Sequence, residues 1–82
     1  MEHRMLFQLH FMDLVKERLP QHLNMPQTVA GLLNVRINSA YRRIRAEQIL
    51  SVKELDLLAT HFDIDLEAVK NMDEASMVFY GG

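Results

Sequence analysis

The sequence predicts an all-α protein, a compact bundle of about five short helices. Apolar residues recur at helical spacing in several separate segments, and residues that start or stop helices stand between these segments. Only residues 76–80 alternate in the manner of a strand, and that stretch is short. With 82 residues, 49% of them hydrophobic and 24% charged, the chain is expected to form one domain around one modest core.

The first predicted helix spans residues 4–19 and ends before Pro20. A second apolar group, Met5, Leu6 and Leu9, projects from its other side, where it either contacts a partner chain or forms an exposed fringe. The face expected to enter the core consists of residues at helical spacing: Phe7, Phe11, Leu14, Val15 and Leu19.

The second predicted helix covers residues 27–33 and follows Pro26, which favours a first helical position. Asn34 comes next and tolerates the left-handed backbone of a tight turn. These signals predict a short helix followed by a turn.

The third predicted helix starts at Asn38 or Ser39, either of which can act as its cap, and continues through Ala46. Ala40 and Ile44 lie four residues apart, so both are expected to pack on neighbouring helices. The opposite side of this helix is strongly cationic. It presents Asn38, Arg42 and Arg45, with Ser39 and Arg43 at its edges and Tyr41 at the boundary.

Two further helices follow. Ser51 and Glu54 have the three-residue spacing of a capping box, which predicts a fourth helix through about Phe62. Asp65 is expected to cap a fifth helix over residues 66–72, because an acidic first turn suits the helix dipole.

The charge of the chain is unevenly distributed. The net charge of −2 divides into zero over residues 1–33, +4 over residues 34–53 and −6 over residues 54–82. Charges more than about 10 Å apart are largely screened at 0.1 M salt, so a local positive surface can attract a polyanion although the whole chain is slightly acidic. An ordinary solvated helix face is the alternative interpretation of the arginines, but such a face mixes both signs of charge.

The stretch QTVAGLLNVRINSAYRRIRAE, residues 27–47, resembles the helix-turn-helix of the lambda-repressor-like (Cro-type) family, without gaps. Ala30 takes the small position of the first motif helix, Asn34 stands where the family prefers glycine, and Ala46 takes a position that is often glycine. The stretch LSVKELDLLATHFDIDLEAV resembles the fourth helix of that family and its link to the fifth. The resemblance covers residues 4–72 and is closest to N-terminal domains of a group of bacterial transcription regulators.

The resemblance implies a sequence-specific DNA-binding domain, either a fragment of a longer regulator or a stand-alone protein. Its third helix would enter the major groove of double-stranded DNA, and the domain would act as a homodimer on a two-fold site. Arg43 stands where the family commonly has an apolar residue, and we expect it to point into solvent while Ile44 supplies the packing. The residues expected nearest the bases are Asn38, Ser39, Arg42 and Arg45. Those expected nearest the DNA backbone are Gln27, Arg36, Tyr41, Arg43 and Lys53.

The remaining expectations concern boundaries and absences. Residues 1–74 are expected to form the DNA-binding domain, and residues 75–82 a C-terminal tail that is either a linker or a pairing segment. No apolar run approaches the length of a membrane span, and the absence of cysteine fits a reducing compartment, so we expect a cytoplasmic protein.

We expect neither an enzyme nor a cofactor or metal protein, because no nucleophile with a base, no glycine-rich phosphate loop and no ligand spacing is present. The histidines, His3, His10, His22 and His61, are expected at the surface. The competing function is a protein-interaction or dimerisation module of the same fold that does not bind DNA.

Overall fold

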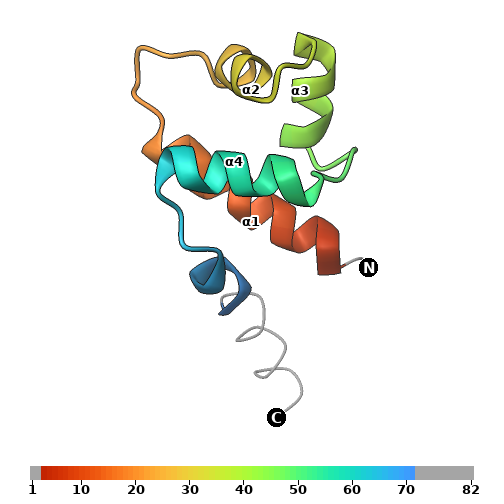
Figure 1. The fold of residues 1–82 in the computed structure, drawn as a ribbon, viewed down its shortest axis with the longest axis vertical. Helices are drawn as coiled ribbons and strands as arrows, with labels where there is room; N and C mark the ends of the chain where they lie inside the picture. Colours follow the sequence, from red (N-terminus) through yellow and green to blue (C-terminus); the bar gives the residue numbers. More distant parts are fainter. Residues whose placement is uncertain (1–2, 72–82) are drawn as a thin grey trace.

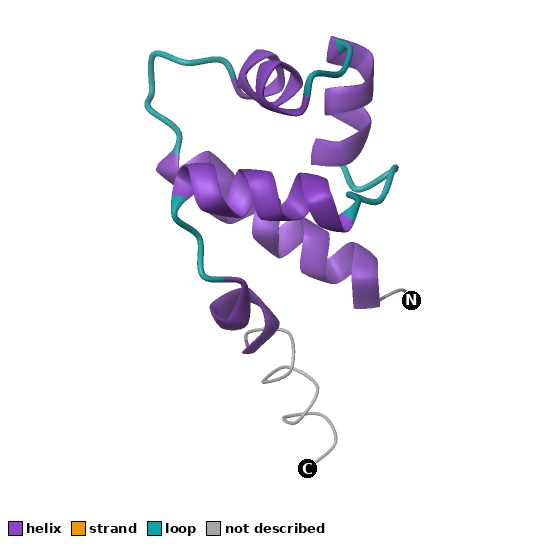
Figure 2. Cartoon of the chain, in the orientation of Figure 1, coloured by secondary structure: helices purple, strands orange, loops and turns teal. Residues whose placement is uncertain are grey.

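The computed structural model describes residues 3–71, and these form an all-α bundle (Figures 1 and 2). Four helices are α1 (His3–Arg18), α2 (Met25–Leu33), α3 (Ile37–Ile44) and α4 (Val52–Phe62). Residues 66–71 form a fifth helical segment. The predicted fold class is therefore confirmed. None of the helices in this part of the chain is both long and apolar enough to cross a membrane.

Helices α1 and α4 pack side by side, and the core lies between them (Figure 1). Leu6 and Leu9 are exposed, as predicted, whereas the buried Gln8 and Met12 were not expected among the core residues of α1. Arg18, in the last turn of α1, donates from Nη1 to the Phe62 carbonyl at 3.3 Å, which satisfies an orphan acceptor at the end of α4. Buried residues of this core come from α1, α4, the connection that precedes α4 and the segment that follows it: Phe11, Met12, Val15, Leu50, Leu58, Ala59, Phe62, Ile64 and Val69.

Both ends of α2 are set by residues close to them in the sequence. The Asn24 side chain accepts from the Gln27 backbone N–H at 3.0 Å, and Pro26 lies in the first turn, where no intrahelical donor is needed. Asn34 ends the helix in the left-handed conformation, with φ 58° and ψ 48°. The predicted turn residue is confirmed, and the short connection packs α3 against α2.

The predicted bounds of α3 were wrong at both ends. Its N-cap is Arg36 and its first residue is Ile37, so neither Asn38 nor Ser39 caps it. It ends at Ile44 because the chain turns sharply there: Ala46 has φ 61°, and the Arg42 carbonyl accepts from Glu47 N at 2.8 Å. A left-handed backbone favours glycine, so Ala46 holds a conformation that is unfavourable for a residue with a side chain.

The predicted capping box of α4 is confirmed in full. The Ser51 hydroxyl accepts from Glu54 N at 3.1 Å, and the Glu54 carboxylate accepts from Ser51 N at 3.1 Å. Asp65 Oδ1 accepts from Glu67 N at 3.0 Å, so the predicted cap of the fifth helical segment is confirmed as well. The predicted end of that segment at residue 72 and the predicted tail 75–82 lie outside the described residues.

Candidate nucleic-acid interface

One side of α3 is buried and the other is open. Ala40 is fully buried and Ile44 packs against the core, which confirms the predicted inner face. Arg42 and Arg45 are exposed on the outer side. This division follows from the period of the helix, which places residues four apart on the same face. The outer residues Asn38, Tyr41, Arg42 and Arg45 line one shallow depression of about 300 Å³.

The prediction that Arg43 points into solvent was wrong. Its side chain is 9% exposed and forms a bidentate ion pair with Glu54, with Nε and Nη2 each 3.1 Å from a carboxylate oxygen. Its Nη1 donates to the Ser39 carbonyl at 3.1 Å. A buried guanidinium needs such partners because an unpaired charge is costly to desolvate. Arg43 is thus occupied inside the domain and leaves the set of residues that are free to contact DNA.

Glu54 connects α3 with the start of α4. One carboxylate oxygen, Oε1, accepts both from Arg43 Nε and from Ser51 N, each at 3.1 Å. Burial alone would raise the pKa of this carboxyl, but the hydrogen bonds from Arg43 and Ser51 and the charge of Arg43 outweigh it and lower the pKa. The carboxyl therefore stays ionised and fixes α3 against α4.

Gln8 holds the C-terminal end of α3 and the connection that follows it. Its Nε2 donates to the Arg43 carbonyl at 2.7 Å and to the Gln48 carbonyl at 2.9 Å, and its Oε1 accepts from Leu50 N at 2.9 Å. The side-chain amide of this 4% exposed residue thus satisfies three backbone groups in the connection between α3 and α4. The sequence analysis missed Gln8, whose only signal is a polar residue between the apolar positions of α1.

Arg45 is exposed but has an acidic neighbour that the sequence analysis did not consider as a site residue. Its Nε lies 2.9 Å from Glu47 Oε2, and its Nη2 lies 3.4 Å from Glu47 Oε1. Its guanidinium carbon lies 5.6 Å from the centre of the Tyr41 ring, within the range of a cation–π contact. The hydrogen bond and the opposite charge of the partner raise the pKa of Arg45 and lower that of Glu47. Both side chains thus stay charged.

The other predicted contact residues lie around α3. Arg36 is exposed at its N-cap, Ser39 is half-buried, and Gln27 and Lys53 are exposed in the first turns of α2 and α4. None of these four lines the depression formed by the outer residues of α3. Ile37, the first residue of α3, is 41% exposed.

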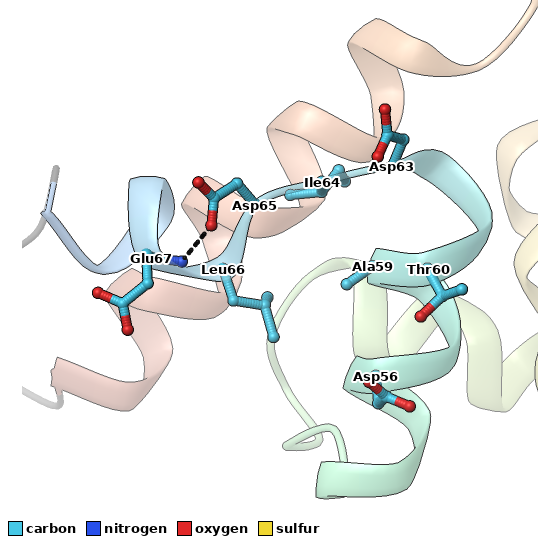
Figure 3. Close-up of a pocket in the computed structure, with 8 residues that line it drawn as sticks. All are labelled: Asp56, Ala59, Thr60, Asp63, Ile64, Asp65, Leu66 and Glu67. Carbon is cyan, nitrogen blue, oxygen red and sulfur yellow. Dashed lines mark hydrogen bonds between the residues drawn. The ribbon is translucent and has the colours of Figure 1, made fainter.

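A second depression, of about 450 Å³, is acidic (Figure 3). It lies on the second half of α4 and on the segment that follows, which Figure 1 places at the opposite end of α4 from α3. The Asp65 carboxylate has a structural explanation, because it caps the fifth helical segment. Its lining residues are Asp56, Ala59, Thr60, Asp63, Ile64, Asp65, Leu66 and Glu67.

The histidines differ in their surroundings. His22 and His61 are exposed as predicted, whereas His10 is half-buried, and its Nδ1 has no hydrogen-bond partner among the described residues. Within residues 3–71, no three histidine, cysteine or acidic side chains are grouped so as to hold a metal ion. Comparison of the chain with protein-family models, with curated proteins and with solved structures found no match.

Proposed function

We propose that this chain is a sequence-specific DNA-binding domain of a bacterial transcription regulator, and that α3 enters the major groove of double-stranded DNA. The observation that carries the proposal is the open side of α3, where Asn38, Arg42 and Arg45 project together from a helix whose inner side is packed. The major groove is about 12 Å wide and accepts one helix. The resemblance of residues 27–47 to a Cro-type helix-turn-helix, together with the tight turn at Asn34, supports the same assignment.

The exposed side chains suit the two kinds of contact that such a domain makes. Arginine donates two hydrogen bonds to guanine O6 and N7, and asparagine bonds adenine in a bidentate manner. We therefore assign base contacts to Asn38, Arg42 and Arg45. Ser39 stays a candidate with a smaller reach because it is half-buried. The proposed backbone contacts are those of the sequence analysis without Arg43: Gln27, Arg36, Tyr41 and Lys53.

A homodimer is part of the proposal. A single small module buries only about 600–1,000 Å² on DNA, and tight specific binding generally needs more contact area. Two copies related by a two-fold axis would read half-sites about one helical turn apart. The operator is then expected to be an inverted repeat.

Selection from random duplexes followed by a salt titration tests the proposal. We expect an enriched inverted repeat, and an affinity that falls with salt at a log–log slope of about −2 per protomer if Arg36 and Lys53 each neutralise a phosphate. Arg42→Ala is the first variant, and Glu67→Gln is the control because Glu67 is an exposed residue on the fifth helical segment. No enrichment together with a slope near zero would exclude this interface.

A second candidate function is a protein-interaction module that keeps the fold without binding DNA. It is favoured by Leu6 and Leu9, which are 36% and 42% exposed on α1. Sedimentation tests it: self-association that Leu9→Gln abolishes, in a wild-type chain that enriches no duplex, would support this function, whereas a wild-type chain that stays monomeric would exclude self-association through α1. The side chain of Met5 and residues 77–80, which we expected to share this role, lie outside the described residues.

A further inference from the structure

Glu47 is an acidic side chain placed among the arginines of α3. Its carboxylate contacts Arg45 Nε at 2.9 Å and Nη2 at 3.4 Å, and both side chains are 55% exposed. Its own backbone is held at the end of α3, where Glu47 N donates to the Arg42 carbonyl at 2.8 Å. The carboxylate therefore sits at a defined place beside the guanidinium, on the same surface as the outer residues of α3.

The contact with Glu47 leaves the donors at the tip of the Arg45 guanidinium free. A guanidinium has five N–H donors in a fixed plane, one on Nε and two on each terminal nitrogen. Glu47 takes the Nε donor and one Nη2 donor, which lie on the same edge of the plane. The donors at the tip, one on each terminal nitrogen, point away from that edge. These two are the donors that match guanine O6 and N7.

Tyr41 restricts the same guanidinium from a second direction. The Arg45 guanidinium carbon lies 5.6 Å from the ring centre, so the plane is held between a carboxylate at its edge and an aromatic face. A side chain that is ordered before binding loses less rotamer entropy when it forms the complex.

We propose that Glu47 is a specificity-determining residue of this interface: it aims the Arg45 guanidinium at a base pair and keeps it from binding a phosphate instead. The inference rests on the proposed DNA-binding function and adds to it the role of an acidic residue. A carboxylate on the DNA-facing surface repels every phosphate, so it weakens binding to all sequences alike. It leaves the hydrogen bonds to the correct base intact. This uniform repulsion leaves the ratio of specific to non-specific binding unchanged. The ratio rises because Glu47 also holds Arg45 away from a phosphate, a contact that Arg45 would otherwise make on random DNA.

The role that we propose for Glu47 requires its side chain to be negatively charged. The bond to Arg45 and the charge of Arg45 lower the pKa of Glu47, and Arg42 acts in the same direction. The carboxylate is therefore ionised at neutral pH, and it needs no switch in pH to act.

Glu47→Gln in the full chain tests the inference, with Glu67→Gln as the control of equal charge change on an exposed residue away from α3. Three duplexes are compared at about 0.1 M salt. They are the selected site, the same site changed at the base pair where Arg45→Ala loses discrimination, and a random sequence. Removing one charge at roughly 8 Å from a phosphate in water is expected to tighten binding to the random duplex about two- to threefold.

Freeing Arg45 adds a second effect. If it then binds a phosphate, the slope of log affinity against log salt on the random duplex becomes steeper by about 0.9 per protomer. A good bidentate contact favours the correct base over a wrong one by about 5- to 150-fold. At the base pair read by Arg45, we expect Glu47→Gln to lower this ratio of affinities about tenfold. Glu67→Gln should leave both the discrimination and the slope unchanged.

The outcomes separate the inference from the function on which it rests. If the wild-type chain binds the selected site but Glu47→Gln keeps its discrimination within twofold, or loses affinity equally for all three duplexes, Glu47 has no role in specificity. The same conclusion follows if Arg45→Ala loses discrimination at no base pair. If the wild-type chain shows neither enrichment nor a salt dependence, the proposed function itself fails. Thermal melting of each variant confirms that the fold is retained.

Discussion

Neutralising Glu54 is expected to destabilise the domain strongly, because this carboxylate is the only charged partner that the described residues offer to the buried Arg43. The isosteric change Glu54→Gln removes the charge and leaves one carbonyl acceptor. An exposed ion pair is worth about 0–1 kcal/mol, whereas removing one partner of a buried pair costs about 3–5 kcal/mol. The side chains are 9% and 20% exposed, closer to the buried case. We expect a loss of about 2–3 kcal/mol in the free energy of unfolding.

Urea and thermal unfolding followed by circular dichroism measure this loss. For a domain of this size, about 1 kcal/mol corresponds to roughly 4–8 °C in Tm, so the expected shift is about 10–20 °C. The double variant with Arg43→Met is expected to recover part of the loss, because replacing both partners by apolar groups removes the uncompensated charge. A Glu54→Gln variant within about 0.5 kcal/mol of the wild type would refute the argument that Arg43 depends on this carboxylate.

The same pair predicts a dependence on pH. The pKa of Glu54 is lower in the folded protein than its ordinary value of 4.5, so the unfolded chain binds the proton more readily. The stabilisation is fully present above pH 4.5 and is lost as the pH falls through the lowered folded-state pKa. Unfolding measured between about pH 3 and pH 7 should show a shallower acid-side loss for Glu54→Gln than for the wild type. Equal acid-side slopes would contradict the assignment.

Three further variants test other parts of the structure. Gln8→Ala is expected to cost about 2–3 kcal/mol, because it leaves the Leu50 N–H and the Gln48 carbonyl without their partner, whereas the Arg43 carbonyl still accepts from Ala46 N; native-state hydrogen exchange at Leu50 should speed up accordingly. Asn34→Val should cost about 1–2 kcal/mol in chemical denaturation while Asn34→Gly stays close to the wild type, because the backbone there has φ 58°. Arg42→Ala should weaken DNA binding without changing Tm, whereas Arg43→Met should lower Tm. The reverse result would restore Arg43 to the binding surface.

Several helix ends were predictable from the sequence because the responsible chemistry is local, although Asn24, the local cap that starts α2 at Met25 instead of residue 27, was missed. The Ser51 hydroxyl and the Glu54 side chain exchange hydrogen bonds across three residues, and Asp65 reaches the N–H only two residues ahead. Asn34 ends α2 through its own backbone preference. The start of α3 was not predictable in this way, because Arg36 occupies the cap position without a side-chain hydrogen bond.

The burial of Arg43 could not be predicted from the residue pattern of α3, because its partner Glu54 lies 11 residues away on another helix. A helical projection assigns every charged residue to solvent, and Glu54 already had an explanation as part of the capping box. Gln8 was missed for the same reason, since its contacts span 35 to 42 residues. For the candidate site, the pattern correctly predicted the outward Arg42 and Arg45. It assigned Arg43 to the wrong side because the burial of a charge depends on tertiary partners.

The buried position of Arg43 between the exposed Arg42 and the half-buried Ile44 has a consequence for engineering. Arg43, which fixes α3 to α4, lies between residues proposed to contact DNA along the helix, but it is not among the residues that line their depression. Libraries that randomise positions 38, 42 and 45 while keeping Arg43 and Glu54 should retain the fold. The outer side of α3 would then be redesigned for other DNA sequences, while the contacts that hold the helix to the domain stay unchanged.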